Sequence, residues 1–462
     1  MRVTIGGTIR VDDPSMELAK WAKKELVIPN PDYAKKKRLG FSTYNTPHEL
    51  WLYETDGKSL ILPYGVIGRI LPMIQEAEIL MDFPPGKAVK YEGNIPLYDY
   101  QEAAVNEAIN NMHGILQSPP GSGKTQMGIA IIAKMGRRAL WLTHTKDLLI
   151  QSRKRAELYY PKTLMGEISE GRVQIGSGIT FATVQTMSKL NLARYRYAWD
   201  VIIVDECHRV SGTPTAMSQF YKVLNSLAAR HKYGLSATVH RADGMIKSTY
   251  AILGEIMYSV PEKAVADKVM KVTVKAVGTD CPLKREAVNS DGTLNYGRYV
   301  NSLIDYRDRN RVIVDLLKQN RGRSCLVLSD RVGHLDEMMS MLPPDMQSMA
   351  CKVDGKMTSK AGKAMREQAM DDMRSGKKLY LFATYTLAKE GLDIPRLERL
   401  FLTTPHTDYA VIAQSIGRIA RTFPGKDAPI AYDFVDYDRH SQKYFSKRCT
   451  TYRKCGCEID KG

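Results

Sequence analysis

The sequence predicts an α/β protein in which a small β-containing domain precedes two parallel-sheet domains. From about residue 95, short apolar runs alternate with amphipathic segments of helical period, which is the pattern of parallel strands covered by helices. The alternation starts again near residue 323, after a stretch around 261–271 where the periodicity lapses. Residues 1–90 lack this alternation and are rich in Pro and Gly. We therefore expect domains at residues 1–90, 91–262 and 263–462.

Composition favours a cytoplasmic, soluble protein with a polyanionic partner. The chain has 462 residues, too many for one hydrophobic core, and no apolar run is long enough to span a membrane. Its net charge is +17, and the excess is uneven: residues 1–95 carry 13 basic and 12 acidic side chains, residues 96–255 carry 19 and 12, and the rest 35 and 26. Such an excess suits phosphate contacts, although a ribosomal or architectural protein would show it too.

The N-terminal region contains a predicted β-hairpin at residues 48–65, with Asp56-Gly57 as its turn. A basic run, Lys35-Lys-Lys-Arg38, precedes it. Trp51, Tyr53 and Tyr64 lie in or beside the hairpin and fit either a packed core or a binding surface, and we assign Trp51 to the core.

The segment Ser118-Pro-Pro-Gly-Ser-Gly-Lys-Thr125 follows an apolar strand and opens a helix. Glycines there let backbone N–H groups surround phosphate oxygens, and the helix N-terminus adds its dipole. Lys124 would reach the β- and γ-phosphates, and Thr125 would hold Mg²⁺. Ser118 stands where the strict pattern has glycine. The predicted nucleotide contacts are Ser118, Pro119, Pro120, Gly121, Ser122, Gly123, Lys124 and Thr125.

Two carboxylates, Asp205 and Glu206, follow the apolar strand at 201–204. The carboxyl ends of strands in α/β sheets are where ligands bind. Asp205 can hold Mg²⁺ through water, and Glu206 can orient and deprotonate an attacking water. An isolated Asp-Glu pair would more often be a solvated cap, but the phosphate loop earlier in the chain favours the catalytic interpretation.

Together these segments resemble the conserved motifs of superfamily 2 helicases. The resemblance rests on the loop at 118–125, Asp205-Glu-Cys-His208, Ser236-Ala-Thr238 and Gln414-Ser-Ile-Gly-Arg-Ile-Ala-Arg421, which occur in the family's order over residues 95–437. It implies two RecA-like domains that use ATP and Mg²⁺. It also implies adenine recognition by Gln101, nucleotide contacts from Gly391 and Asp393, and coupling through His208, Ser236 and Thr238.

The last motif supplies Gln414, Arg418 and Arg421 from the second domain. The two arginines are three residues apart and share a helical face. If the second domain docks on the first, these guanidinium groups can stabilise negative charge that grows on the γ-phosphate, while Gln414 positions water or phosphate.

Small, hydroxyl-bearing or basic residues at other strand ends resemble the family's nucleic-acid contacts. Such residues suit backbone phosphates and carry no sequence specificity, although each alone is also typical of a loop or cap. The predicted contacts are Thr143, His144, Lys146, Thr183, Gln185, Arg241, Ser329, Arg331 and Thr384.

Within the superfamily, the chain is similar to the UvsW-like phage branch-migration helicases, including those of T-five-like phages, and more distantly to XPB and RecG. The residues that carry this similarity are Pro96-Leu-Tyr-Asp-Tyr-Gln101, Asp205-Glu-Cys-His208 and Leu235–Gly244. It implies a monomeric motor on branched DNA (forks, D-loops and four-way junctions), in contact with recombination or replication proteins and located in the host cytoplasm if phage-encoded.

Three alternatives remain open: an RNA helicase, a duplex-DNA translocase that serves a nuclease, and a nonenzymatic binding protein. Intact Lys124, Glu206 and Arg421 argue against the last. A further open question concerns Cys449, Cys455 and Cys457, whose spacing is irregular for zinc even with His440 as a fourth ligand, so reduced surface thiols are the preferred interpretation.

Overall fold

The computed structural model describes residues 1–239, 244–266, 269–289, 292–355, 357, 359–389 and 392–460. They form two units, Met1–Pro261 and Glu262–Gly462, and each unit is built around a parallel sheet. The α/β class predicted from the alternating pattern is therefore confirmed. Within the described part of the chain, no helix is long and apolar enough to cross a membrane.

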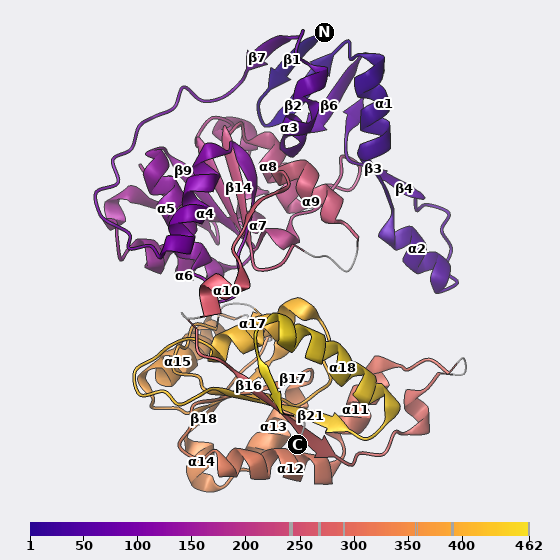
Figure 1. Ribbon diagram of the computed structural model, residues 1–462, viewed down its shortest axis with the longest axis vertical. Coiled ribbons are helices and arrows are strands. Elements are labelled where there is room, and N and C mark those ends of the chain that lie inside the picture. The colour runs from indigo at the N-terminus through magenta and orange to yellow at the C-terminus, as the bar shows by residue number, and fades with distance from the viewer. Residues whose placement is uncertain are drawn as a thin grey trace. The chain divides into compact units, whose positions relative to one another are not determined.

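The first unit begins with a separate five-stranded sheet (Figure 1). In sheet order its strands are β5 (Glu54–Thr55), β6 (Ser59–Pro63), β2 (Thr8–Asp12), β1 (Arg2–Ile5) and β7 (Glu78–Met81). A two-stranded pair, β3 (Val27–Pro29) with β4 (Glu49–Trp51), and the helices α1 (Met16–Glu25), α2 (Pro31–Arg38) and α3 (Ile67–Ile70) complete this region. Single 3-10 turns span Tyr64–Val66 and Leu71–Met73.

The predicted hairpin is confirmed in its second part. β5 pairs antiparallel with β6 around the Asp56-Gly57 turn, where Gly57 has a φ of 86°. The Asp56 carboxylate accepts hydrogen bonds from the backbone N–H groups of Lys58 and Ser59, which fixes the turn. Residues 49–51, however, pair with β3 rather than joining the hairpin. The core assignment of Trp51 is also wrong, since its ring is exposed whereas Tyr53 and Tyr64 are buried.

The main sheet of the first unit has eight strands, all parallel except the edge pair β10–β11. In sheet order they are β11 (Arg172–Gln174), β10 (Met165–Ser169), β12 (Ile179–Thr183), β9 (Ala139–Thr143), β13 (Val201–Asp205), β14 (His231–Ser236), β8 (His113–Gln117) and β15 (Ile256–Ser259). Its helices are α4 (Asp99–Asn110), α5 (Lys124–Met135), α6 (Lys146–Ala156), α7 (Val184–Met187), α8 (Gln219–Ser226) and α9 (Ile246–Leu253). Single 3-10 turns span Lys162–Leu164, Leu192–Tyr195 and Cys207–Arg209.

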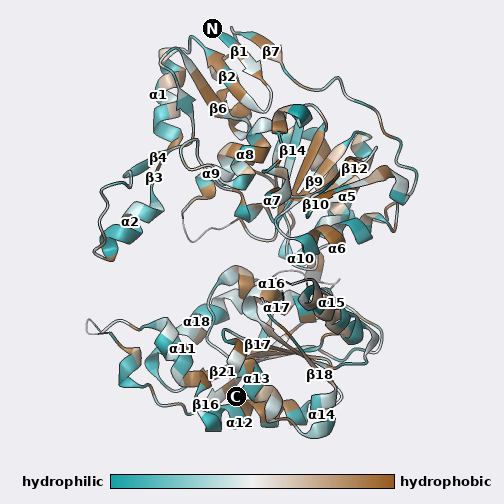
Figure 2. Cartoon of the chain, turned by 180° about the vertical axis from the view of Figure 1, so that it is seen from behind, coloured by the Kyte–Doolittle hydropathy of each residue, from teal (hydrophilic) through white to brown (hydrophobic). Residues whose placement is uncertain are grey.

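The second unit carries a seven-stranded parallel sheet. In sheet order its strands are β18 (Ala350–Val353), β19 (Tyr380–Thr384), β17 (Cys325–Ser329), β20 (Arg399–Leu402), β21 (Ile430–Asp436), β16 (Thr273–Thr279) and β22 (Glu458–Asp460). Its helices are α10 (Glu262–Ala266), α11 (Tyr296–Ile304), α12 (Arg307–Gln319), α13 (Val332–Ser340), α14 (Pro344–Ser348), α15 (Lys360–Ser375), α16 (Tyr385–Lys389), α17 (Tyr409–Ile419) and α18 (Arg439–Lys454), and a 3-10 turn spans Arg285–Ala287. Figure 2 shows hydrophobic strands flanked by helices with hydrophilic outer faces, as burial of a parallel sheet requires.

The N-terminal sheet is fastened to the eight-stranded sheet by close backbone contact. A Cβ atom added to Gly7 would lie 2.3 Å from the carbonyl oxygen of Asn225, so only glycine fits there. Tyr64 donates its hydroxyl to the carbonyl of Arg230 at 2.6 Å. The Lys232 ammonium, which is fully buried, donates to the carbonyls of Gly7 at 2.9 Å and Leu224 at 2.7 Å. The two sheets of the first unit are thus joined rigidly.

We expect the unfolding free energy of the first unit to rise with pH between about 7 and 10. Burial lowers the pKa of Lys232 to about 7, with a smaller effect from the charge of Arg196. An unfolded lysine keeps its proton to about pH 10.4. The unfolded chain therefore binds more protons in this window, so raising the pH favours folding, by on the order of 1 kcal/mol per pH unit.

Urea unfolding followed by tryptophan fluorescence measures this effect, because all four tryptophans lie in the first unit. Lys232→Met is the control, since the variant lacks the titrating group and all other groups cancel in the comparison. The stability of the variant relative to wild type should be highest near pH 6.5 and decline towards pH 9.5. Parallel pH curves for the two proteins would show that Lys232 does not titrate in this way.

Candidate nucleotide and nucleic-acid sites

The predicted phosphate loop connects the end of β8 to the start of α5. Gly121 and Gly123 have φ angles of 83° and 81°, a region that favours glycine. Gly123 is the N-cap of α5, so the first backbone N–H groups of a twelve-residue helix are presented by the loop. A helix N-terminus of this kind binds phosphate groups through its N–H donors and its dipole.

The loop is bonded to Gln101, the residue predicted to recognise adenine, and to its neighbour Tyr100. Gln101, which is buried, donates its amide to the carbonyl of Ser122 at 2.8 Å and accepts from the backbone N–H of Tyr98 at 3.0 Å. Tyr100 donates its hydroxyl to the same Ser122 carbonyl. Both ends of the Gln101 amide are therefore bonded to protein, and its adenine contact stays a prediction.

Ser118 replaces the usual glycine without strain. It is fully buried and its backbone is not in the left-handed region. Its hydroxyl donates to the hydroxyl of Ser122, and its backbone N–H donates to the carbonyl of Ser236 at 2.9 Å. The departure from the strict glycine pattern thus leaves the loop intact and ties it to the end of β14.

The two acids meet the loop lysine at the carboxyl end of β13. Asp205 ends the strand, and Glu206 follows with a φ of 52°, a strained value for a residue other than glycine. The Lys124 ammonium lies 3.5 Å from the carbonyl oxygen of Ser118, and its positive charge favours the ionised form of both carboxyl groups. The structure therefore brings Lys124, Asp205 and Glu206 together, as predicted.

The environments of the two acids push their pKa values apart. Burial, reinforced by the charge of Glu206, raises the pKa of Asp205 above its usual range. Burial also opposes ionisation of Glu206, but the close contact with His208 and the charge of Lys124 hold its pKa below the usual range. Glu206 is therefore the acid that stays ionised, while Asp205 lacks enough positive charge nearby.

This deficit of positive charge fits a divalent cation beside a polyphosphate. Mg²⁺ prefers oxygen ligands and commonly uses one or two protein groups together with phosphate oxygens. The Asp205 carboxylate and the Thr125 hydroxyl, in the first turn of α5, are oxygen ligands of this type. No group of three or more His, Cys, Asp or Glu side chains that suits a metal occurs among the residues that the structure describes.

The three C-terminal cysteines lie at or beside the hydrophobic core of the second unit. Cys449 is buried, and Cys455 and Cys457 are partly buried against the hydrophobic core of the second unit. Burial raises the pKa of Cys455 to about 12, which disfavours a metal-binding thiolate. The three cysteines are present as thiols, but the predicted surface position is wrong, because Cys449 belongs to the hydrophobic core and the other two pack against it.

His208 connects the acids to the end of β14. Its Nδ1 atom lies 3.2 Å from the Glu206 carboxylate and 3.2 Å from the Ser236 hydroxyl. That hydroxyl in turn donates to the carbonyl of Thr238 at 2.6 Å. The three residues predicted to couple nucleotide and nucleic acid thus form one chain of contacts that starts at Glu206.

In the second unit, Arg418 lies in the last turn of α17, and Arg421 follows the helix end. Arg421 forms an ion pair with Asp393. Burial would raise the pKa of Asp393, but the charges of Arg421 and Arg418 lower it. The structure therefore gathers these three predicted residues. Gln414 lies on the same helix, and its buried Oε1 atom makes no hydrogen bond to any described residue.

Lys426 is a residue of this cluster that sequence reasoning missed. Its ammonium donates to the carbonyls of Ile419 at 2.7 Å, Arg421 at 2.6 Å and Pro395 at 3.3 Å. It thereby fastens the segment that carries Arg421 to the segment that follows Asp393. Its place in a Gly-Lys turn after a helix gave no signal of this role.

The predicted nucleic-acid contacts of the first unit lie at the carboxyl ends of the neighbouring strands β9 and β12, where Thr143 pairs with Thr183. Both threonine side chains are buried. Lys146 is engaged with Glu167 and Ser169. Gln185 is exposed, and its amide donates to the carbonyl of His144 at 2.6 Å. Only part of the predicted row therefore reaches the surface.

The second unit repeats this arrangement at the ends of β17 and β19, where Ser329 pairs with Thr384. Ser329 is fully buried and bonded to His334, whereas Arg331 and Thr384 are partly exposed. The hydroxyl groups of Thr143 and Ser329 are shielded from solvent in this structure, so their contact with nucleic acid stays a prediction. The other contacts stay predictions, and Arg241 and Gly391 lie outside the described residues.

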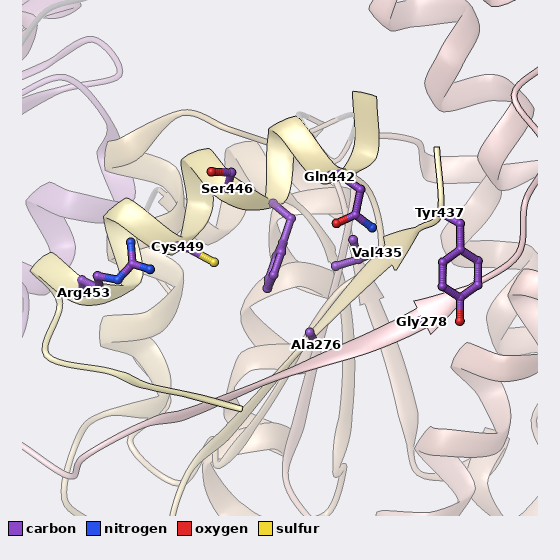
Figure 3. Close-up of a pocket in the computed structure, with 9 residues that line it drawn as sticks. Ala276, Gly278, Val435, Tyr437, Gln442, Ser446, Cys449 and Arg453 are labelled. Carbon is purple, nitrogen blue, oxygen red and sulfur yellow. The ribbon is translucent and has the colours of Figure 1, made fainter. Parts of the chain in front are cut away.

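A cavity of about 570 Å³ lies elsewhere in the second unit, between α18 and the strands β16 and β21 (Figure 3). Tyr437, Gln442, Cys449 and Arg453 are among its lining residues. None of the residues predicted to contact nucleotide or nucleic acid is among its lining residues, so it is separate from those candidate sites.

Known proteins resemble the chain over both units. Residues 94–241 match the family model "Type III restriction enzyme, res subunit", and residues 308–423 match "Helicase conserved C-terminal domain". A protein of Acanthamoeba polyphaga mimivirus whose name describes an ATP-dependent RNA helicase is 27% identical over 80% of this chain and 69% of its own. A helicase-named protein of Escherichia phage T5 is 23% identical over 81% and 78%. The DNA 3'-5' helicase XPB of Kineococcus radiotolerans is 25% identical over 77% and 64%.

Solved structures share the fold. A fragment of a type I restriction enzyme subunit from Vibrio vulnificus aligns with a TM-score of 0.58 at 18% identity, over 97% of this chain and 82% of that one. T4 UvsW aligns over 100% and 99% at 15% identity, but its TM-score of 0.42 is too low to support the UvsW-like group, which stays a prediction. The two RecA-like domains are confirmed. The match to a restriction-enzyme helicase model in the first unit and to a helicase C-terminal model in the second supports a helicase of superfamily 2.

Proposed function

We propose that this superfamily 2 helicase acts on branched DNA: forks, D-loops and four-way junctions. The observation that carries the proposal is the N-terminal sheet, which is fastened to the first RecA-like domain through Gly7, Tyr64 and Lys232. A motor that moves along one DNA arm while a rigidly attached domain holds another can push a branch point along. The similarity to a DNA 3'-5' helicase supports DNA as the substrate.

ATP is bound in this proposal by the loop at 118–125, with Lys124 on the terminal phosphates and Thr125 and Asp205 as ligands of Mg²⁺. The metal ion would neutralise phosphate charge as the bond to the γ-phosphate breaks. Glu206 stays ionised because His208 and Lys124 stabilise its charged form. Its carboxylate then orients the attacking water and accepts the proton as Lys124 turns towards phosphate.

Arg418 and Arg421 supply positive charge to the γ-phosphate in the ATP-bound state, and Gln414 positions the water. A guanidinium suits this role because it is planar, always charged and able to donate two hydrogen bonds at once. Asp393 keeps Arg421 oriented before ATP arrives. Loss of the γ-phosphate removes the negative charge that residues of both domains bind. The domains can then separate, and their contacts with nucleic acid weaken.

Transmission within the first domain runs through His208, Ser236 and Thr238. Their contacts lead from Glu206 to the end of β14, and the backbone of Ser118 is bonded to the same strand end. A change at the γ-phosphate would therefore reach the end of β14, the strand that precedes Arg241, one of the predicted DNA contacts, in the sequence. Recombination and replication proteins are the expected partners of such a motor.

Two other substrates are favoured by specific similarities. The mimivirus relative is named as an RNA helicase, which favours RNA. The match to a restriction-enzyme subunit favours a duplex translocase that serves a nuclease. Each alternative predicts a different nucleic acid as the one that stimulates ATP turnover. The alternatives also differ in whether the strands of the substrate separate.

ATP hydrolysis and strand separation on one panel test the proposal: single-stranded DNA, blunt duplex, three-strand fork, four-way junction and RNA duplex. The expected result is at least about tenfold greater stimulation of ATPase by forks and junctions than by blunt duplex, with strand displacement on both branched substrates. Stimulation by RNA alone would establish the RNA alternative. Strong stimulation by blunt duplex without strand separation would establish the translocase.

A further inference from the structure

Residues 27–51 form a lobe at one edge of the N-terminal domain, built from β3, α2, the connection at 39–48 and β4 (Figure 1). None of the residues of α2 is buried. Figure 1 shows the helix standing away from the five-stranded sheet of its own domain. β3 and β4 reach the hydrophobic core of that domain through Ile28, with Val27 and Leu50 packed against it, whereas α2 adds nothing to that core. Polar contacts therefore hold the helix and the connection at 39–48 in place.

The lobe is held together by a compact set of hydrogen bonds. The Asn30 side chain caps α2 through the backbone N–H of Asp32 and also donates to the carbonyl of Pro47 at 2.7 Å. Lys36 donates its ammonium to the Thr46 hydroxyl at 2.6 Å, and its carbonyl accepts from the backbone N–H of Phe41 at 2.9 Å. Both ends of the connection are therefore pinned to the last turns of the helix.

Four consecutive basic residues, Lys35 to Arg38, occupy the last turns of α2. Apart from the Lys36 bond to Thr46, their side chains form no hydrogen bond or ion pair with the residues that the structure describes. Positive charge near a helix C-terminus stabilises the helix dipole, but one or two residues suffice for that. The other residues of the N-terminal domain are more acidic than basic, so this is a local concentration of charge.

Large hydrophobic side chains lie beside this charge and remain in solvent. The exposed fraction is 64% for Phe41 and 92% for Tyr44. Leu39 and Trp51 are also exposed. Tyr53 and Tyr64 of the same domain are buried, so the domain has a core that takes aromatic rings, and the exposed ones are held outside it.

We propose that this lobe binds single-stranded nucleic acid: Lys35, Lys37 and Arg38 contact backbone phosphates while Phe41 and Tyr44 stack on unpaired bases. Aromatic rings stack on base faces with little sequence preference, and basic groups beside them follow the backbone. Duplex DNA hides its base faces, so the rings select a single strand. The inference rests on the proposed function and deepens it, since forks expose single strands next to a duplex.

An acidic membrane surface is the competing ligand, because basic and aromatic residues together also suit lipid headgroups. The sequence of α2, Pro-Asp-Tyr-Ala-Lys-Lys-Lys-Arg, offers no apolar face to insert into a bilayer. Single-stranded nucleic acid is therefore favoured, and vesicle binding becomes an outcome of the test.

The test uses the full-length protein and fluorescence anisotropy with a 20-nucleotide oligo-dT, a 20-base-pair duplex and vesicles containing phosphatidylserine. Tyr44→Leu should weaken binding to oligo-dT about tenfold, whereas Tyr44→Phe, which keeps a stacking ring, should bind like wild type. Duplex affinity should not change in either variant. A triple change of Lys35, Lys37 and Arg38 to Ala should lower the affinity for both DNA ligands. The slope of log affinity against log salt concentration should fall by about two to three for each ligand.

The matched control is a triple change of Lys20, Lys23 and Lys24 to Ala, on α1 of the same domain, which removes equal charge at an exposed site. ATPase without DNA is measured for every variant and should equal wild type, which separates failure of the lobe from failure of the motor. The proposal is overturned if Tyr44→Leu binds oligo-dT as tightly as Tyr44→Phe, if both triple variants lose affinity equally, or if vesicles rather than oligo-dT bind through the lobe.

Discussion

Replacing Glu206 with glutamine is expected to lower ATP turnover by about a hundredfold to ten-thousandfold while leaving ATP affinity nearly unchanged. Glutamine has the same shape but carries no charge and accepts no proton, so it removes the group that orients and deprotonates water. The Lys124 loop that would hold the phosphates is untouched by the change. Phosphate release and binding of a fluorescent ATP analogue measure the two effects separately.

The control for this variant is Glu92→Gln, because Glu92 is exposed on the surface of the same unit and pairs with Lys90. It should hydrolyse ATP like wild type. A Glu206→Gln protein that kept more than a tenth of wild-type turnover would exclude Glu206 as the residue that activates water.

Replacing Arg421 with alanine is the second change with a large expected effect, a loss of about a thousandfold in nucleic-acid-stimulated turnover. Arginines that neutralise transition-state charge in phosphoryl transfer commonly contribute a thousandfold or more. Arg421→Lys should recover only a small part, because an ammonium cannot donate the paired hydrogen bonds of a guanidinium. Single-turnover hydrolysis with saturating forked DNA measures the chemical step.

Arg311→Ala is the matched control, since Arg311 is an exposed arginine of the same unit that pairs with Asp308. Its turnover should equal that of wild type. If Arg421→Ala lost ATPase only through unfolding, its thermal transition would fall with it, so both variants are compared by circular dichroism. Normal turnover in a folded Arg421→Ala protein would remove Arg421 from the catalytic groups.

The parts of the fold that sequence predicts well are those with strong local periodicity. The runs at 139–143 and 201–205 are apolar except for their last residues, Thr143 and Asp205, and form buried central strands with those bounds. The residues that follow them are polar, and parallel pairing brings strand ends to one edge of the sheet. For this reason the proximity of Lys124 to Asp205 and Glu206 can be predicted from their positions after parallel strands, although these residues are far apart in sequence.

Other features depend on tertiary contacts that leave no local pattern. Thr143 and Ser329 look like surface hydroxyls in sequence, but each ends a central strand and is covered by a neighbouring loop or helix. Lys232 and Lys426 resemble surface lysines, yet both ammonium groups are bonded to backbone carbonyls from distant segments. Trp51 belongs to a two-stranded pair outside the main core, so its apolar ring remains exposed.

Strand displacement on a three-strand DNA fork is the measurement that tests most directly whether ATP hydrolysis at the Lys124 and Glu206 site drives movement. Wild-type protein with ATP and Mg²⁺ should release the displaced strand. Neither wild type with a nonhydrolysable ATP analogue nor Glu206→Gln with ATP should release it. Displacement by either of these two, or rapid ATP turnover by wild type with no displacement on any branched substrate, would contradict the account.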